Sequence, residues 1–145
     1  MILYLDTSAL VKLYVREPGS TALRSHASKA EALATSVVAY AEARAAFGRL
    51  KQSGTSSEGR HQQRLERFGL DWEALLRVEL IPEVLRSAGD LAEIYSLRGF
   101  DSIHLASALW LKARVSVPVD FAVFDRRLGV AAARAGLAVV PKSRA

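Results

Sequence analysis

The fold is decided by residues 2–12, which read ILYLDTSALVK. The first four of them, residues 2–5, are all apolar, as is typical of a strand buried on both faces of a sheet. The run stops at Asp6, and the polar residues after it can cap a helix over residues 9–15. The stretch therefore predicts a strand that leads directly into a helix, with an acidic side chain at the junction.

Similar units follow along the rest of the chain. Short apolar runs predict further strands over residues 32–35, 77–81, 119–124 and 137–140. Helical patterns and break residues predict further helices over residues 21–29, 37–51, 57–76, 82–97, 101–114 and 125–135. Short apolar strands that alternate with helices are typical of a parallel sheet covered by helices. We therefore expect one α/β domain over residues 1–145, built on a central, mainly parallel sheet of four to five short strands.

The composition excludes several classes of protein and site. Half of the 145 residues are hydrophobic, which excludes a disordered chain. The absence of Cys excludes disulfides, thiolate metal sites and Cys nucleophiles, and there are only three His. A bound metal would therefore be held mainly by oxygen ligands, which favour Mg²⁺ and similar cations. No apolar run approaches the roughly 18 residues of a membrane span, and the start does not resemble a signal peptide, so we expect a cytoplasmic protein.

The formal net charge of +5 favours a polyanionic partner such as nucleic acid. The basic residues are scattered along the chain, and an ordinary solvated surface would explain the charge equally well. The denser group comprises Arg44, Arg49, Lys51, Arg60, Arg64 and Arg67, and a separate pair comprises Arg126 and Arg127. From these we take Arg44, Arg126 and Arg127 as candidates for contact with nucleic-acid phosphates.

Four acidic residues stand in apolar surroundings, whereas most of the fifteen acids look like surface residues. Asp6 and Asp125 each follow a predicted strand, and ligands of parallel sheets bind beyond the carboxyl ends of the strands. Asp101 opens the most apolar predicted helix, and Glu42 is expected in mid-helix on an apolar stripe. A buried ionised carboxylate is costly unless it is paired or bound to a metal, so these acids are candidate site residues.

Each of the four acids also has a purely structural explanation. Asp6, Asp101 and Asp125 precede predicted helices and could simply be N-caps. Glu42 could form an internal ion pair with a buried Arg or Lys. If the four carboxylates converge, however, they repel one another, and a divalent cation such as Mg²⁺ or Mn²⁺ relieves that repulsion. A site of this kind can activate a water molecule against a phosphodiester.

Four sequence blocks resemble, in order and spacing, those of the PIN-domain ribonucleases. The blocks are ILYLDTSAL at residues 2–10, the helix around Glu42, FDSIHLA at residues 100–106 and FDRRL at residues 124–128. The whole chain resembles a VapC-type toxin of a toxin–antitoxin pair. The resemblance implies a three-layer α/β/α fold and an endoribonuclease that hydrolyses RNA phosphodiesters with water activated by carboxylate-bound Mg²⁺ or Mn²⁺.

The resemblance also implies roles for individual residues. Asp6, Glu42 and Asp101 correspond to catalytic metal ligands of the family. Asp125 corresponds to its fourth acid, which also contributes to the metal site. Ser8 resembles a hydroxyl that hydrogen-bonds at such sites, although it could equally be a partner of the helix cap.

One position departs from the pattern of the family, because many members carry Thr or Ser where this chain has Val123. His104 matches a His that is common in the family in a structural role. The partners that the resemblance implies are an RNA substrate, a small antitoxin protein and a second copy of the chain in a homodimer.

Two other functions compete with this interpretation. The main alternative is a non-catalytic RNA- or partner-binding module on the same fold. The second is an aspartyl-phosphate phosphatase, in which Asp6 would be the nucleophile. Such enzymes usually carry a second Asp two residues further on, where this chain has Ser8.

Overall fold

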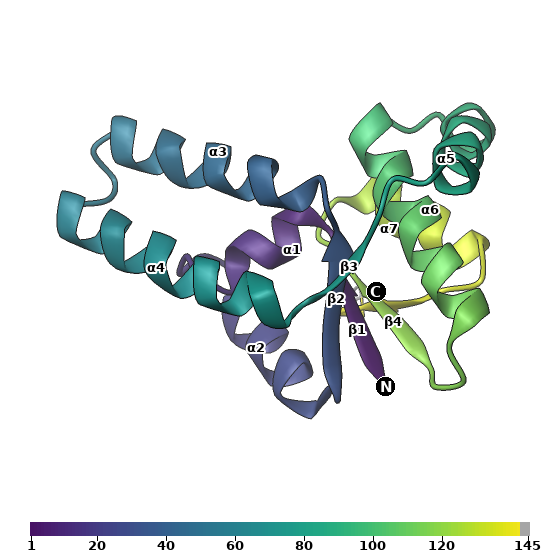
Figure 1. Ribbon diagram of the computed structural model, residues 1–145, viewed down its shortest axis with the longest axis horizontal. Helices are drawn as coiled ribbons and strands as arrows, with labels where there is room; N and C mark the ends of the chain where they lie inside the picture. The colour runs from purple at the N-terminus through teal and green to yellow at the C-terminus, as the bar shows by residue number, and fades with distance from the viewer. Residues whose placement is uncertain (143–145) are drawn as a thin grey trace.

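A computed structural model describes residues 1–142 as a central sheet with helices on both sides (Figure 1). The sheet contains β1 (Ile2–Leu5), β2 (Ala32–Ser36), β3 (Leu76–Val78), β4 (Val119–Ala122) and β5 (Ala138–Val140). The strand order is β3-β2-β1-β4-β5, and every neighbouring pair is parallel. The predicted α/β fold with a parallel sheet is thus confirmed. The last three residues of the predicted domain lie outside the described residues.

Helices cover both faces of this sheet and complete three layers. One face carries α1 (Thr7–Lys12), α2 (Ser20–Lys29), α3 (Ala39–Gln52) and α4 (Glu58–Ala74). The other carries α5 (Pro82–Tyr95), α6 (Gly99–Arg114) and α7 (Arg126–Arg134). α3 and α4 form a pair of helices that extends beyond the sheet (Figure 1).

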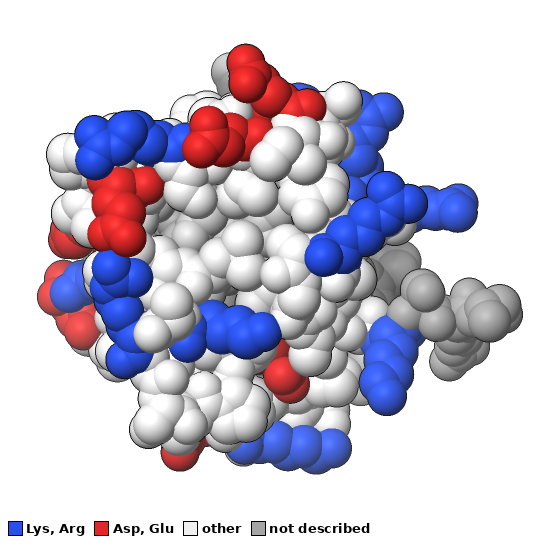
Figure 2. Space-filling view, turned by 90° about the vertical axis from the view of Figure 1, so that its right-hand side faces the viewer, with Lys and Arg blue, Asp and Glu red and all other residues white. Residues whose placement is uncertain are grey.

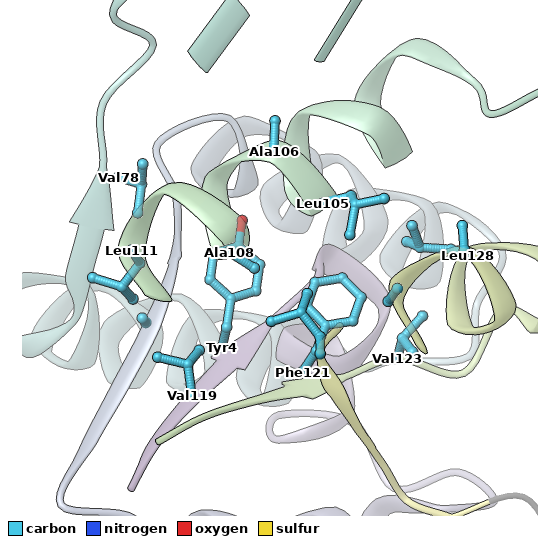
Figure 3. Close-up of a cluster of buried hydrophobic side chains, with 14 of the residues drawn as sticks. Tyr4, Val78, Leu105, Ala106, Ala108, Leu111, Val119, Phe121, Val123 and Leu128 are labelled. Carbon is cyan, nitrogen blue, oxygen red and sulfur yellow. The ribbon is translucent and has the colours of Figure 1, made fainter. Parts of the chain in front are cut away.

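The alternation of side chains along β1 supplies both layers of the core. Tyr4 points toward α6 and lies against Phe121 of β4, with 5.5 Å between the two ring centroids (Figure 3). Leu3 and Leu5 point to the opposite face and pack with α1 and the α3–α4 pair. All four residues of β1 are buried, as expected for the central strand of a covered parallel sheet.

Three strands are shorter than predicted: β3 and β4 end earlier, and β5 begins at Ala138 rather than at residue 137. β3 ends at Val78, rather than at residue 81, because β2, its one strand neighbour within residues 1–142, ends at Ser36. β4 ends at Ala122, rather than at residue 124. Beyond it the N–H of Val123 still donates to the Val140 carbonyl at 3.0 Å, which carries the chain along the last strand before it turns into α7.

The surface agrees with the scattered charge seen in the sequence. On the side of α5, α6 and α7, the Lys and Arg side chains lie at separate places around a largely uncharged middle (Figure 2). None of the helices in residues 1–142 combines the length and the apolarity that a bilayer-spanning segment requires.

Substitution of Phe121 by Ala tests the core between β1, β4 and α6. Phe121 is fully buried, so Phe121→Ala removes its contact with Tyr4 and leaves a cavity. We expect the free energy of unfolding in urea to fall by about 3–5 kcal/mol. Leu70 is 72% exposed, and Leu70→Ala should change the same quantity by less than about 0.5 kcal/mol. Similar losses for both variants would contradict this core.

Candidate functional site

All four candidate acids lie at the beginnings of helices. Asp6 is the N-cap of α1 and Asp125 is the N-cap of α7. Glu42 lies in the first turn of α3, and Asp101 lies in the first turn of α6. The helices α1, α3 and α7 follow the neighbouring strands β1, β2 and β4, so the parallel sheet brings their starts to one edge. The positive end of each helix dipole favours a carboxylate there.

Two details of the sequence interpretation need correction. Glu42 was expected in mid-helix, but α3 begins at Ala39, and Glu42 therefore belongs to its first turn. Asp101 was expected to open its helix and to be a possible N-cap, but α6 begins at Gly99 and its N-cap is Arg98. The N-cap alternative is correct in form for Asp6 and Asp125, because each accepts a hydrogen bond from a backbone N–H of its helix.

Asp6 is buried, with an exposed fraction of 4%. Its Oδ1 accepts hydrogen bonds from the Ser8 hydroxyl at 2.8 Å and from the Ala9 N–H at 2.9 Å. Both roles considered for Ser8 are therefore fulfilled, because its hydroxyl contacts Asp6, which is at once the candidate acid and the N-cap of α1. Burial raises the pKa of Asp6, and the charge of Asp101 adds to the rise, although His104 and the two hydrogen bonds partly oppose it. Among the described residues, none donates a hydrogen bond to Asp6 Oδ2.

Glu42 is held by a hydrogen-bonded chain that reaches into the core. Its Oε1 accepts from the Thr7 hydroxyl at 2.5 Å and lies 3.2 Å from Nε2 of His104. Nδ1 of His104 lies 2.9 Å from the hydroxyl of Tyr4. Burial by itself would raise the pKa of Glu42, but the hydrogen bonds from His104 and Thr7 outweigh it and lower that pKa.

One assignment of hydrogens satisfies this whole chain. Thr7 donates its proton to Glu42, so its oxygen is free to accept from His104 Nε2, which lies 2.9 Å away. His104 then carries its proton on Nε2, and its Nδ1 accepts from the Tyr4 hydroxyl. Both ring nitrogens are thus used, which supports the structural role for His104. The ion pair with a buried Arg or Lys, which was the structural alternative for Glu42, does not occur in residues 1–142.

Arg98 forms ion pairs with the other two acids, Asp101 and Asp125, and the sequence interpretation did not identify it. Its Nε lies 3.2 Å from Asp101 Oδ2, and its terminal nitrogen Nη2 lies 3.6 Å from Asp125 Oδ2. The only signal in the sequence is a basic residue three positions before Asp101, which is too common to single out.

Two hollows flank these side chains. The first has a volume of about 540 Å³ and is lined by residues that include Thr7, Glu42 and Arg49. The second has a volume of about 580 Å³ and lies along the start of α6, where Asp101 lines it. Glu42 and Arg98 line both hollows, so these two side chains stand between them.

The three arginines predicted to contact phosphates lie in different places. Arg126 and Arg127, at the start of α7, line a separate hollow of about 510 Å³ between α7 and the end of α5. Arg44 lies over the ring of Tyr40 and donates to the Tyr40 hydroxyl at 3.0 Å. Tyr40 stacks on Phe68 of α4, so Arg44 faces α4 and not the Glu42 side of α3.

The donor set suits a hard divalent cation, because carboxylate oxygens are the ligands such ions prefer. Within residues 1–142, however, no three carboxylate or imidazole groups lie close enough together to hold a metal ion as the side chains stand. Binding would require the carboxylates to turn toward a common point, and Asp101 and Asp125 would have to release Arg98.

Comparison with known proteins shows relatives over almost the whole chain. The family model described as PIN domain matches residues 3–133. Ribonuclease VapC45 of Mycobacterium tuberculosis is 37% identical over 141 residues, which cover 97% of this chain and 95% of that protein. Among solved structures, FitAcB from Neisseria gonorrhoeae superposes with a TM-score of 0.66 at 19% identity, covering 96% of both chains. A toxin–antitoxin complex from Klebsiella pneumoniae has a TM-score of 0.61 at 14% identity, covering 85% of this chain and 86% of that one.

Asp6→Asn is expected to stabilise the metal-free protein at neutral pH. Burial raises the pKa of Asp6 in the folded state above its ordinary value of 3.8, so the native state binds more protons than the unfolded state. The free energy of unfolding then falls as the pH rises from that value through the raised pKa. Asn keeps the Oδ1 acceptor used by Ser8 and Ala9 but carries no charge.

Urea unfolding at a series of pH values measures this effect. The advantage of Asp6→Asn should vanish in acid and grow as the pH rises toward neutrality. Asp90, exposed on α5, provides the control, and Asp90→Asn should show no such trend. A variant that is less stable than the wild type at pH 7 would contradict the prediction.

Tyr4→Phe tests the chain that supports Glu42. Loss of the hydroxyl leaves the buried Nδ1 of His104 without its donor. We expect the free energy of unfolding to fall by about 1–3 kcal/mol. The hydroxyl of Tyr95 makes no hydrogen bond within residues 1–142, so Tyr95→Phe should change stability by less than about 0.5 kcal/mol. Equal effects of the two variants would rule out a stabilising role for the Tyr4–His104 bond.

Proposed function

The chain belongs to the PIN domain family, and on this premise we propose that it is an endoribonuclease that depends on Mg²⁺ or Mn²⁺. A relative of 37% identity is named a ribonuclease. The observation that carries the proposal is the gathering of acids at the starts of helices along one edge of a parallel sheet. Of these acids, Asp6, Glu42 and Asp101 would hold the cation, with Asp125 as the fourth acid.

The protein contacts of these carboxylates support such a role. Asp6 is fixed through Oδ1 and Glu42 through Oε1. Asp125 accepts through Oδ1 from the Leu128 N–H at 3.1 Å. In each of these side chains one oxygen orients the group. The second oxygen of Asp6 and of Glu42 accepts no hydrogen bond within residues 1–142, whereas Oδ2 of Asp125 is paired with Arg98. When bound, a divalent cation would supply a Lewis acid and a water molecule of lowered pKa.

The chain's own residues keep the acids in the state that the reaction needs. The hydrogen bonds from His104 and Thr7 lower the pKa of Glu42, so this carboxylate stays ionised at neutral pH. Tyr4 holds the ring of His104 from the core and thereby orients its Nε2–H toward Thr7 and Glu42, which lie 2.9 and 3.2 Å from Nε2. Asp6 is nearly enclosed, which excludes bulk water from one side of the site.

Arginines around the acids would hold the RNA backbone. Arg49 lines the hollow beside Glu42, and Arg126 and Arg127 follow Asp125 directly. Guanidinium groups bind phosphate oxygens through paired hydrogen bonds, which orient the strand without reading its sequence. Arg44 would contact RNA only outside the hollow beside Glu42, because it faces α4.

We further propose that the ribonuclease is the toxin of a toxin–antitoxin pair and acts in the cytoplasm as a homodimer. One of the similar structures is a toxin–antitoxin complex, which supports a small antitoxin protein as a partner. Exposed apolar side chains on α5 and α7 provide surface for contacts between chains, namely Leu85, Ile94 and Val130. Charge is sparse in the middle of that side of the molecule (Figure 2).

Cleavage of a mixed tRNA and rRNA pool by antitoxin-free protein tests the activity. We expect cuts with Mg²⁺ or Mn²⁺ and none in excess EDTA. Asp101→Asn should lower the rate about a thousandfold, because charge stabilisation by a metal is worth several kcal/mol in the transition state.

Asp90→Asn provides the matched control, since it makes the same chemical change at an exposed position of α5. Its rate should stay within about twofold of the wild type. Full activity in EDTA would overturn the metal-dependent mechanism. Folded wild-type protein that binds RNA but cleaves none of it would favour the non-catalytic binding module.

A further inference from the structure

Arg98 stands among the acids that the proposed function assigns to a cation. It bridges Asp101 at 3.2 Å and Asp125 at 3.6 Å, from two different helices. Within residues 1–142, no other Lys or Arg forms an ion pair with any of the four acids. A guanidinium is always charged at physiological pH, so it is a permanent counter-charge at this point of the site.

The contact is placed so that it can be released. The side chain of Arg98 is 80% exposed, although it starts from the N-cap position of a fixed helix. Ion pairs in contact with water are weak, so a ligand that binds the carboxylates more tightly can displace the guanidinium. The backbone of Arg98 stays in place meanwhile, and the guanidinium remains within reach of the site.

Arg98 also faces the space in which a substrate would lie. It lines the hollow beside α3 and the hollow along α6, and among the described residues only Glu42 is likewise common to the two. A phosphate that enters either hollow therefore meets this guanidinium. Its donors match the oxygens of a phosphodiester and can bind two of them at once.

We propose that Arg98 is the residue that binds the scissile phosphate, and that in the free protein it occupies the carboxylates that a cation takes in the active state. The proposal rests on the proposed ribonuclease function. With a cation on Asp101 and Asp125, the guanidinium of Arg98 would be released from both carboxylates and would be available to the RNA. Arg98 thus opposes cation binding but assists cleavage.

Removal of Arg98 should therefore move two measurements in opposite directions. In Arg98→Ala, Mn²⁺ binding to RNA-free protein, measured by titration calorimetry, should become about three- to tenfold tighter, because two exposed ion pairs no longer compete. Single-turnover cleavage at saturating Mn²⁺ should slow by about 10²-fold, since a charged hydrogen bond to the substrate is lost. Arg98→Lys keeps the charge but not the paired donors, so its Mn²⁺ affinity should match the wild type while cleavage remains slow.

Arg86→Ala is the matched control, because Arg86 is exposed on α5 and has no ion pair in the described part of the chain. It removes the same charge and should change neither measurement by more than about twofold. Thermal unfolding of each variant checks that the fold is kept.

The outcomes distinguish a failure of the role of Arg98 from a failure of the proposed ribonuclease function. An active wild type with an Arg98→Ala variant that binds Mn²⁺ and cleaves normally would overturn the role of Arg98 alone. Weaker Mn²⁺ binding together with slower cleavage would also overturn it, since Arg98 would then merely hold the carboxylates in position. A folded wild type that neither binds Mn²⁺ nor cleaves RNA would overturn the ribonuclease function, and this proposal with it.

Discussion

The parallel direction of all five strands is the constraint on which the site depends. Because each strand points the same way, the helices that follow β1, β2 and β4 begin at one edge of the sheet. The acids at those starts, together with Asp101 at the start of α6, gather from four separate parts of the chain. An antiparallel pairing of β1 with either neighbour would send one of these acids to the opposite edge.

Gathering several carboxylates has an electrostatic cost, and the protein offsets it differently at each acid. Helix starts favour negative charge at all four positions. Asp6 relies on Ser8 and a backbone N–H, and Glu42 relies on Thr7 and a buried His104. Asp101 and Asp125 share an arginine. Hydrogen bonds from neighbouring side chains and backbone thus hold Asp6 and Glu42. Asp101 and Asp125 are held by the exposed guanidinium of Arg98, which water and ligands can reach.

Sequence patterns identified the acids and the layers but not the contacts between them. Apolar runs that end in Asp6 or precede Asp125 predict strand ends, because a buried strand consists of consecutive apolar residues and ends where polar residues begin. The predicted place of Glu42 in the middle of its helix was wrong, because the start of α3 carries no side-chain cap that would mark it. Val123, the departure from the family pattern, belongs to the core between β4 and α7 and lies 5% exposed.

The sequence by itself determined the order of strands and helices, the parallel α/β class, the family resemblance and the choice of the four candidate acids. These follow from local burial patterns and from motifs that are contiguous in the chain. Only the tertiary structure decided that His104 supports Glu42, that Arg98 bridges Asp101 and Asp125, and that Arg44 faces α4. Such contacts join residues up to 100 positions apart, as between Tyr4 and His104, and depend on side-chain directions that the residue order alone does not give.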